Sequence, residues 1–294
     1  MVWDYELKMR VRSPRPTVFE RLLRIEHLAR WFCGWARIDP KVGGAFRFGG
    51  ETCIFQPEGR GWETRIEEGE VLRRFAFEWP IHGTPTRVAY DLEDAGDAAT
   101  ILVARHQGVP VPESGCGSVL DAWRVCLGNL KSIGEGRGES VRPDHTLLYD
   151  GQWSLATIVE ASTDRVYEAL VTPAQVDGWS TGGVPSGRVT PEPEPGAMYA
   201  FGDPDGPLRV LELVPGRGLA LGDTTPGRDA RWDLRLEEKA SGTAVYVSAA
   251  GPSDATRALR DRGRWSDRLV ALKNLVEGGD PGFENPYEAQ ARQR

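Results

Sequence analysis

The sequence is poor in the residues that most often hold metals or form disulfide frameworks. Its 294 residues include four cysteines, four histidines and three methionines. Cys33, Cys53, Cys116 and Cys126 show no CxxC spacing, so we expect reduced thiols in a cytoplasmic protein. The histidines have no ligand-like spacing and no nucleotide-binding fingerprint is present, so we expect neither a metal nor a cofactor.

Long apolar runs and an excess of positive charge are also absent. No run approaches the ~18 residues that a membrane span requires, and the N-terminal MVWDYELKMR lacks the pattern of a secretory signal. The net charge of −7 argues against a nucleic-acid surface, because phosphate binding needs clustered Lys and Arg. Lysine is scarce, with 5 Lys against 31 Arg, a bias typical of GC-rich genomes such as those of actinobacteria.

The chain contains an internal repeat. The segment TVFERLLRIEHLARWF at 17–32 returns as RVYEALVTPAQVDGWS at 165–180, and the two align without a gap. Each copy is preceded by alternating apolar residues, which predict a first strand over 5–13 and again over 153–162. We infer that one domain has been duplicated.

Each copy continues with alternating strands and ends in a long helix. The segments 87–94 and 231–238 correspond, as do 100–108 and 243–251, and all four alternate well enough to be half-buried strands. The terminal helices carry one apolar stripe each, at i, i+4 and i+7. The stripe consists of Trp123, Leu127 and Leu130 in the first copy and of Trp265, Leu269 and Leu272 in the second.

This order of elements predicts an α+β fold in which a curved antiparallel sheet wraps around one long C-terminal helix, twice. We place the first domain at 1–138 and the second at 151–279. The segment 134–150 is rich in Gly, Pro and charge, and residues 139–150 within it are expected to be a linker. The last residues, 280–294, are expected to form a frayed or loosely docked tail.

The motifs resemble the SRPBCC or START-like helix-grip superfamily, and within it the branch named after the activator of Hsp90 ATPase homologue. The resemblance rests on the first-helix motif VYEAL at 166–170, a following tryptophan and a Gly-rich turn before an aromatic strand. A Gly-Thr hairpin, SGT at 241–243, and a final W-x3-L-x2-LK helix complete it; the first copy departs from the pattern with AAT at the hairpin. The likeness covers residues 3–136 and 151–279.

The resemblance implies two tandem helix-grip (START/SRPBCC) domains, each enclosing an elongated apolar cavity. Members bind lipids, steroids or polyketides, some cyclise polyketides, and some actinobacterial relatives act in enediyne and other antibiotic pathways. The chain is therefore expected to bind a hydrophobic small molecule. The side chains expected to line the cavities are Trp35, Phe48, Phe77, Trp79, Tyr90, Trp123, Leu127, Phe201, Trp232, Trp265 and Leu269.

No catalytic set is assembled by the sequence. His106 and Arg105 are the first candidates for a base or a polar anchor near the mouth of the cavity. A histidine on an apolar strand face is more often a core or rim residue, and Arg105 falls on the opposite face, where a surface charge is expected. Trp31 and Trp179 recur at a packing position and are expected to belong to the core.

Three functions stay open, with a non-catalytic one favoured. The first is sequestration, transport or self-protection through binding of a large polyketide-like product such as an enediyne. Under self-protection, a glycine of the protein that lines the cavity could be a cleavage site. The second is a polyketide cyclase or aromatase. The third is a regulatory or chaperone-associated module, for which the sequence names no protein partner. Because the second copy has lost aromatics and carries a Pro-rich insert at 189–196, the first domain is expected to bind better.

Overall fold

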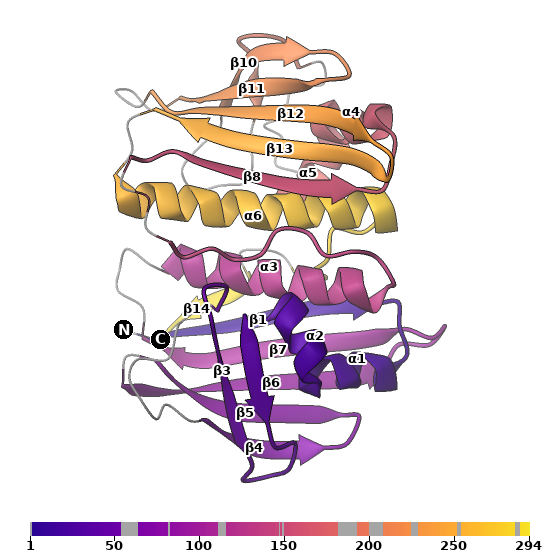
Figure 1. Cartoon of the computed structure of the whole chain (residues 1–294), viewed down its shortest axis with the longest axis vertical. Helices are drawn as coiled ribbons and strands as arrows, with labels where there is room; N and C mark the ends of the chain where they lie inside the picture. Colours follow the sequence, from indigo (N-terminus) through magenta and orange to yellow (C-terminus); the bar gives the residue numbers. More distant parts are fainter. Residues whose placement is uncertain are drawn as a thin grey trace. The chain divides into compact units, whose positions relative to one another are not determined.

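The computed structural model shows two compact units, each with a sheet and a long helix (Figure 1). The first unit comprises 1–145 together with 283–294, and the second comprises 146–282. The residues described are 2–53, 64–81, 83–110, 116–146, 148, 150–181, 193–199, 208–224, 229–251, 254–285 and 289–294.

The first domain contains eight strands and three helices among the described residues. The strands are β1 Trp3–Val11, β2 Trp35–Ile38, β3 Ala45–Gly49, β4 Thr64–Glu70, β5 Arg74–Ile81, β6 Thr84–Asp94, β7 Thr100–Val109 and β14 Ala291–Gln293. The helices are α1 Arg15–Leu23, α2 Ile25–Trp31 and α3 Cys116–Gly134.

The second domain repeats the order with six strands and three helices among the described residues. The strands are β8 Trp153–Val159, β9 Met198–Tyr199, β10 Leu208–Val214, β11 Gly218–Asp223, β12 Arg231–Lys239 and β13 Gly242–Ala250. The helices are α4 Thr163–Val171, α5 Pro173–Thr181 and α6 Ala255–Gly278.

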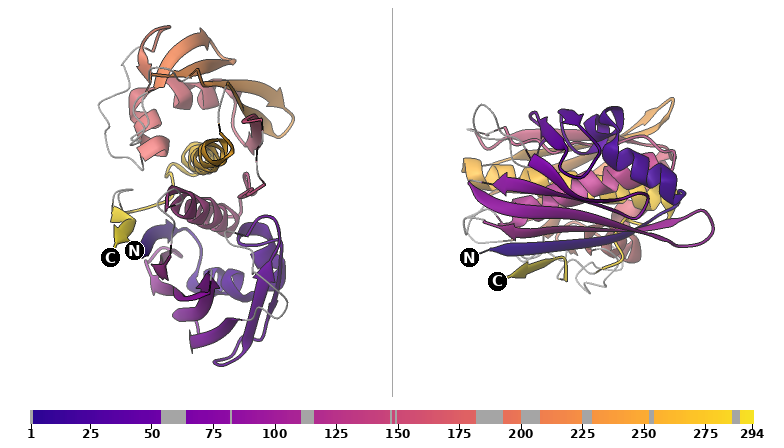
Figure 2. Two further views of the ribbon diagram at one scale, coloured as in Figure 1. Left: turned by 90° about the vertical axis from the view of Figure 1, so that its left-hand side faces the viewer. Right: turned by 90° about the horizontal axis from the view of Figure 1, so that it is seen from below.

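Each domain folds its sheet around its own long helix (Figure 2). The first sheet has the order β14-β1-β7-β6-β5-β4-β3-β2, and the second has the order β8-β13-β12-β11-β10-β9. The paired strands are antiparallel throughout the described residues. The predicted tandem helix-grip fold is confirmed.

Local sequence explains where the helices begin and end. Ser162 caps α4, its hydroxyl accepting a hydrogen bond from the Arg165 N–H, and Asp254 caps α6 in the same way. The long helix therefore starts at Ala255, about three turns before the predicted stripe residue Trp265. It ends at Gly279, whose φ of +75° is the left-handed conformation that glycine adopts readily.

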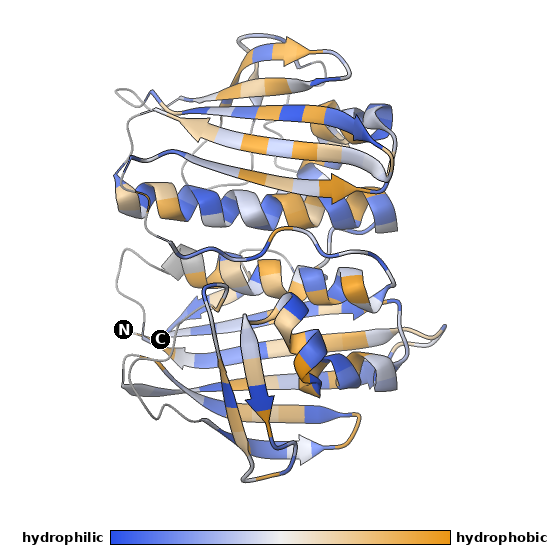
Figure 3. Cartoon of the chain, viewed as in Figure 1, coloured by the Kyte–Doolittle hydropathy of each residue, from blue (hydrophilic) through white to orange (hydrophobic). Residues whose placement is uncertain are grey.

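Apolar residues alternate along the strands, so one face of each sheet is buried against the long helix (Figure 3). In β12 the buried positions are Trp232, Leu234 and Leu236, with more exposed residues between them. In β1 they are Tyr5, Leu7, Met9 and Val11, all nearly inaccessible to solvent.

The two repeated tryptophans are core residues, as predicted. Trp31 is 0% exposed and Trp179 is 1% exposed. The indole N–H of Trp31 donates to the Arg21 carbonyl over 3.0 Å, and that of Trp179 donates to the Ala169 carbonyl over 2.9 Å. Each tryptophan thus ties the second short helix to a backbone acceptor near the end of the first.

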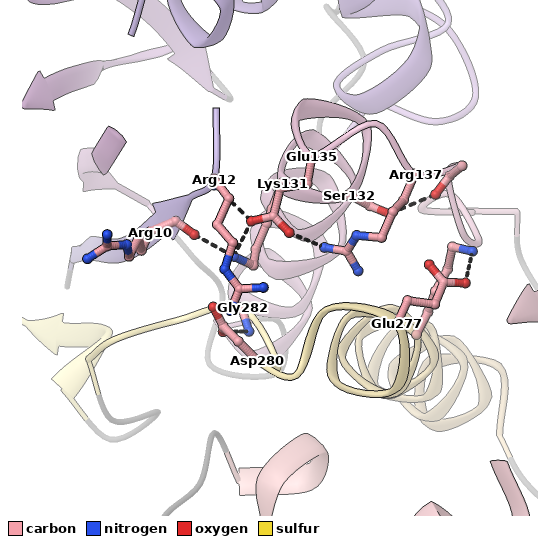
Figure 4. A network of polar contacts seen from close by, with 11 residues as sticks. Arg10, Arg12, Lys131, Ser132, Glu135, Arg137, Glu277, Asp280 and Gly282 are labelled. Atoms are coloured by element: carbon pink, nitrogen blue, oxygen red, sulfur yellow. Dashed lines mark hydrogen bonds and ion pairs between the residues drawn. The ribbon is translucent and has the colours of Figure 1, made fainter. Parts of the chain in front are cut away.

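The lysine that ends the W-x3-L-x2-LK motif of each long helix forms a buried ion pair in both domains. In the first, Lys131 Nζ lies 2.7 Å from Glu135 Oε1 and also donates to the Arg10 carbonyl, while the Arg12 N–H donates to Glu135 (Figure 4). Arg137 completes this set by donating to the second carboxylate oxygen.

The second domain repeats the ion pair at the same places. Lys273 Nζ lies 2.6 Å from Glu277 Oε1 and donates to the Ile158 carbonyl over 2.7 Å. The Glu160 N–H donates to Glu277 over 2.7 Å. In both copies the lysine ammonium and the glutamate carboxylate of the long helix therefore form hydrogen bonds with the backbone at the end of the first strand.

The tail is part of the first domain, and the expectation of a frayed end is wrong. Residues of β14 pair with β1, with Trp3 opposite Gln293 and Tyr5 opposite Ala291. Phe283 is 9% exposed, and its ring lies 4.7 Å from the guanidinium carbon of Arg124. A short polar strand of this kind carries little local signal, which is why the sequence does not predict it.

The segment expected to begin the linker is also held by the first domain. The Arg142 guanidinium donates to the carbonyls of Ala29 and Cys33, and the Asn129 side chain donates to the Val141 carbonyl. The division between the compact units consequently falls between 145 and 146.

Candidate functional site

The interior of the first domain is a cluster of aromatic rings packed against one another. Phe48 lies 4.9 Å from Trp79, centroid to centroid, and Phe46 lies 4.9 Å from Phe77. The cluster consists, among the described residues, of Trp31, Phe32, Phe46, Phe48, Phe75, Phe77, Trp79, Tyr90, His106 and Trp123. Such edge and offset contacts add to the free energy already gained by burying the rings.

Both ring nitrogens of His106 form hydrogen bonds within this interior. The indole N–H of Trp123 donates to His106 Nδ1 over 3.0 Å, so Nδ1 is the acceptor and Nε2 carries the proton. Nε2 lies 2.8 Å from the hydroxyl of Thr86, which in turn donates to the Trp79 carbonyl. The imidazole stacks on the Trp79 ring at a centroid distance of 5.2 Å.

Burial lowers the pKa of His106 to about 3, because the charged imidazolium would lose its hydration. The ring is therefore neutral at physiological pH, and the lone pair that a general base would use already accepts the Trp123 hydrogen bond. Arg105 lies on the other face of β7, where its guanidinium pairs with Glu6 and Asp91. The structure does not bring the two catalytic candidates together.

This buried histidine predicts a dependence of stability on pH. The pKa is depressed in the folded state, so its contribution is complete above the unfolded value near 6.5 and is lost as the pH falls toward 3. Urea unfolding at pH 7, 6 and 5 should show wild type losing about 1.4 kcal/mol per pH unit, relative to His106→Gln, below pH 6.5. Parallel curves for the two proteins would contradict a neutral buried imidazole.

The structure places most of the predicted ligand residues inside the domains. Phe48, Phe77, Trp79, Tyr90 and Trp123 are members of the aromatic cluster, and Leu127 is buried beside it. Trp232, Trp265 and Leu269 are buried in the second domain. Trp35 is the exception, being 48% exposed on β2, and Phe201 lies outside the described residues.

Cys33 and Cys126 of the first domain are buried structural thiols. Cys33 is fully buried, and burial raises its pKa to about 12. Burial likewise raises the pKa of Cys126 to about 12. Neither thiol has the thiolate character that a nucleophile needs.

The second domain has a different interior at the positions of His106 and its neighbours, which the sequence reasoning did not single out. Trp232 pairs with Ala249 across β12 and β13, and Ala249 pairs with Trp153 across β13 and β8. A comparison of the two copies of the repeat could have revealed this difference, because Ala249 occupies the place that His106 has in the first copy.

A polar hollow lies on the surface of the second domain, away from these residues. Its volume is about 480 Å³. Its lining consists of Glu160, Ala161, Ser162, Thr163, Asp164, Glu238, Lys239, Ser241 and Gly242, none of which was predicted to contact a ligand.

Solved structures with a similar arrangement come from several organisms. DynU16, described as a putative protein in the dynemicin biosynthetic locus, is 17% identical with a TM-score of 0.39, over 94% of this chain and 98% of its own. CalU16 from Micromonospora echinospora is 22% identical with a TM-score of 0.34, over 42% and 71%. PFC0360w, an HSP90 activator from Plasmodium falciparum, is 18% identical with a TM-score of 0.31, over 37% and 75%.

Among proteins of curated function, none matches the chain significantly. No helix within the described residues is long and apolar enough to cross a membrane. The family model for "Activator of Hsp90 ATPase homolog 1-like protein" matches residues 12–135 and again 160–277, which together are most of the chain. The chain therefore belongs to the activator of Hsp90 ATPase homolog 1-like family, with two copies of the family domain in tandem.

Proposed function

We propose that this protein binds a large hydrophobic or aromatic small molecule within a helix-grip domain, without transforming it. The ligand class that fits is a polyketide-like natural product, an enediyne being one kind, held for sequestration, transport or self-protection. The family supports this role because its sheet and helix bury a wide apolar surface, and small-molecule sites are mostly apolar with a few polar anchors.

The observation that carries the proposal is the state of His106. It is the histidine of the aromatic interior, yet it is neutral, buried and bonded through both nitrogens. An interior of this kind offers ring contacts to a ligand, but its histidine is not a free base for proton transfer. Binding is therefore better supported than catalysis.

Native mass spectrometry of the freshly purified chain, with and without an extract of apolar metabolites from its host, tests the proposal. We expect a retained small molecule whose mass is unchanged after release by denaturation. A molecule returned with an altered mass would indicate an enzyme, and retention of a protein alone would indicate an interaction module. A chain cut at a glycine after exposure would identify the protection as self-sacrificing.

A further inference from the structure

The register of the two sheets shows which residues of the second domain take the places of the His106 cluster. In the first domain Tyr5 and Val88 flank His106 on neighbouring strands. In the second domain Trp153 and Trp232 flank Ala249 in the same way. The second domain has therefore lost the ring in the middle of the row and gained one in place of Val88.

The residues around this row have become smaller or polar as well. The alignment of the copies puts Asp223 where the first domain has Trp79, and Ala230 where it has Thr86. Trp265 keeps the position of Trp123 on the long helix. The second domain therefore keeps the indole that His106 accepts from in the first, but it has replaced the imidazole with a methyl group.

Trp232 carries an indole N–H that has no partner among the described residues. Its side chain is 5% exposed and lies on the buried face of β12, in line with Leu234 and Leu236. The nitrogen is inaccessible to solvent and donates to no group in the part of the chain that the structure describes. Burying such a donor unpaired costs about 1–3 kcal/mol, and buried tryptophans usually find an acceptor.

The spacing of the row suits one flat ring. Neighbouring strands lie about 4.8 Å apart, so Trp153 and Trp232, two strands apart, have about 10 Å between their backbones. A planar group that lies edge-on to Trp232 can accept its N–H, because that N–H lies in the plane of the indole. Within the described part of the chain neither tryptophan has an aromatic contact, and Ala249 between them is partly exposed.

We infer that the second domain binds a planar aromatic group over Ala249, between Trp153 and Trp232, with the Trp232 N–H donating to a carbonyl or other acceptor on that group. The inference rests on the proposed function and names its site and ligand class. His106 fills the corresponding place in the first domain, where it accepts the hydrogen bond of Trp123. The geometry therefore favours the second domain as the binder, although the sequence favoured the first.

The end of this site is polar. Asp223 pairs with Arg257, in the first turn of α6, over 2.8 Å, and the Asp223 side chain is 7% exposed. On β11 the alternation puts Asp223 on the same face as Leu221, which pairs with Trp232. A ligand with an aromatic body and a polar edge matches this order of apolar and charged groups.

The test compares two flat probes that differ in one acceptor, fluorenone and the hydrocarbon fluorene, each titrated into the full chain by tryptophan fluorescence quenching. We expect fluorenone to bind about tenfold more tightly, because only its carbonyl can accept the Trp232 hydrogen bond. Trp232→Phe should bring the two affinities close together. Ala249→His should abolish binding of both, and exposed Trp35→Phe should change neither.

An assigned ¹H–¹⁵N spectrum of wild type keeps the test independent of whether a variant folds. The Trp232 indole N–H resonance should move further downfield at saturation with fluorenone than with fluorene, because only fluorenone accepts its hydrogen bond. Equal affinities for the two probes, or an indole resonance that moves no further with fluorenone than with fluorene, would overturn the inference. If wild type and Ala249→His retain a host metabolite equally, the proposed binding function is supported, but the proposed site over Ala249 is wrong. If wild type binds neither probe and retains no metabolite, both the proposed binding function and the proposed site are wrong.

Discussion

Removal of residues 283–294 is expected to lower the free energy of unfolding of the first domain by about 4 kcal/mol. Burial of an aromatic side chain such as Phe283 contributes about 2 kcal/mol. The buried guanidinium of Arg124 also loses its 2.8 Å bond to Gln290, and hydrogen bonds to charged groups contribute about 1.5–3 kcal/mol.

Backbone contacts along the edge of the sheet add to this loss. The Glu284 N–H donates to the Lys8 carbonyl over 2.7 Å, and the Glu6 N–H donates to the Gln290 carbonyl over 3.0 Å. The Asn285 side chain bonds both the Lys8 N–H and the Glu6 carbonyl. Without these partners β1 becomes an open edge, which is prone to pairing with other chains.

Urea unfolding of the full chain and of residues 1–282, with hydrogen exchange read by mass spectrometry, measures the effect. Exchange should accelerate in β1 and leave β12 and β13 as they are. Arg292→Ala, at an exposed position of β14, should change stability by less than about 0.5 kcal/mol and serves as the matched control. An unchanged unfolding midpoint for 1–282 would show that the tail adds nothing.

Glu135→Leu is expected to destabilise the first domain by about 3–5 kcal/mol, because it leaves the Lys131 ammonium buried without its carboxylate. The two side chains are 1% and 6% exposed. The double variant Lys131→Met with Glu135→Leu should recover most of the loss, since it removes both charges. Glu70→Leu, which breaks an exposed pair with Arg73, should cost no more than about 1 kcal/mol.

The same carboxylate makes the first domain sensitive to acid. Burial alone would raise the pKa of Glu135, but the Arg12 N–H and the Lys131 ammonium outweigh it, and the pKa is lowered from its usual value of 4.5. The stabilisation is therefore complete above 4.5 and is lost as the pH falls below that value. Unfolding at pH 5 and 3 should converge for wild type and Glu135→Gln; equal differences at both pH values would rule out this carboxylate as the cause.

Much of the fold follows from local patterns, because the helix stripes, the alternating strands and the caps at Ser162 and Gly279 each depend on neighbours in the sequence. The repeat then supplies the rest of the topology by analogy. The return of β14 to β1 has neither kind of support: it joins the two ends of the chain through a three-residue strand that the second copy does not share.

The site was less predictable for a physical reason. Alternation along β5 shows that Phe77 and Trp79 face the interior, and the apolar stripe of α3 shows the same for Trp123. Whether these rings enclose space or fill it depends on how their volumes fit together. The pairing of His106 with Thr86 and Trp123 joins three separate elements and leaves no local signature. The exchange of His106 for Ala249 is visible only when the two copies are compared strand by strand.

The position of β14 also sets the order in which the chain can mature on the ribosome. Synthesis proceeds at about 5–20 residues per second, so the first domain waits roughly 10–30 seconds for its last strand while the second is being made. The second domain, continuous from 146 to 282, can complete its sheet first. An incomplete N-terminal sheet would meanwhile be exposed to chaperones and to neighbouring nascent chains, and the emergence of β14 ends that interval.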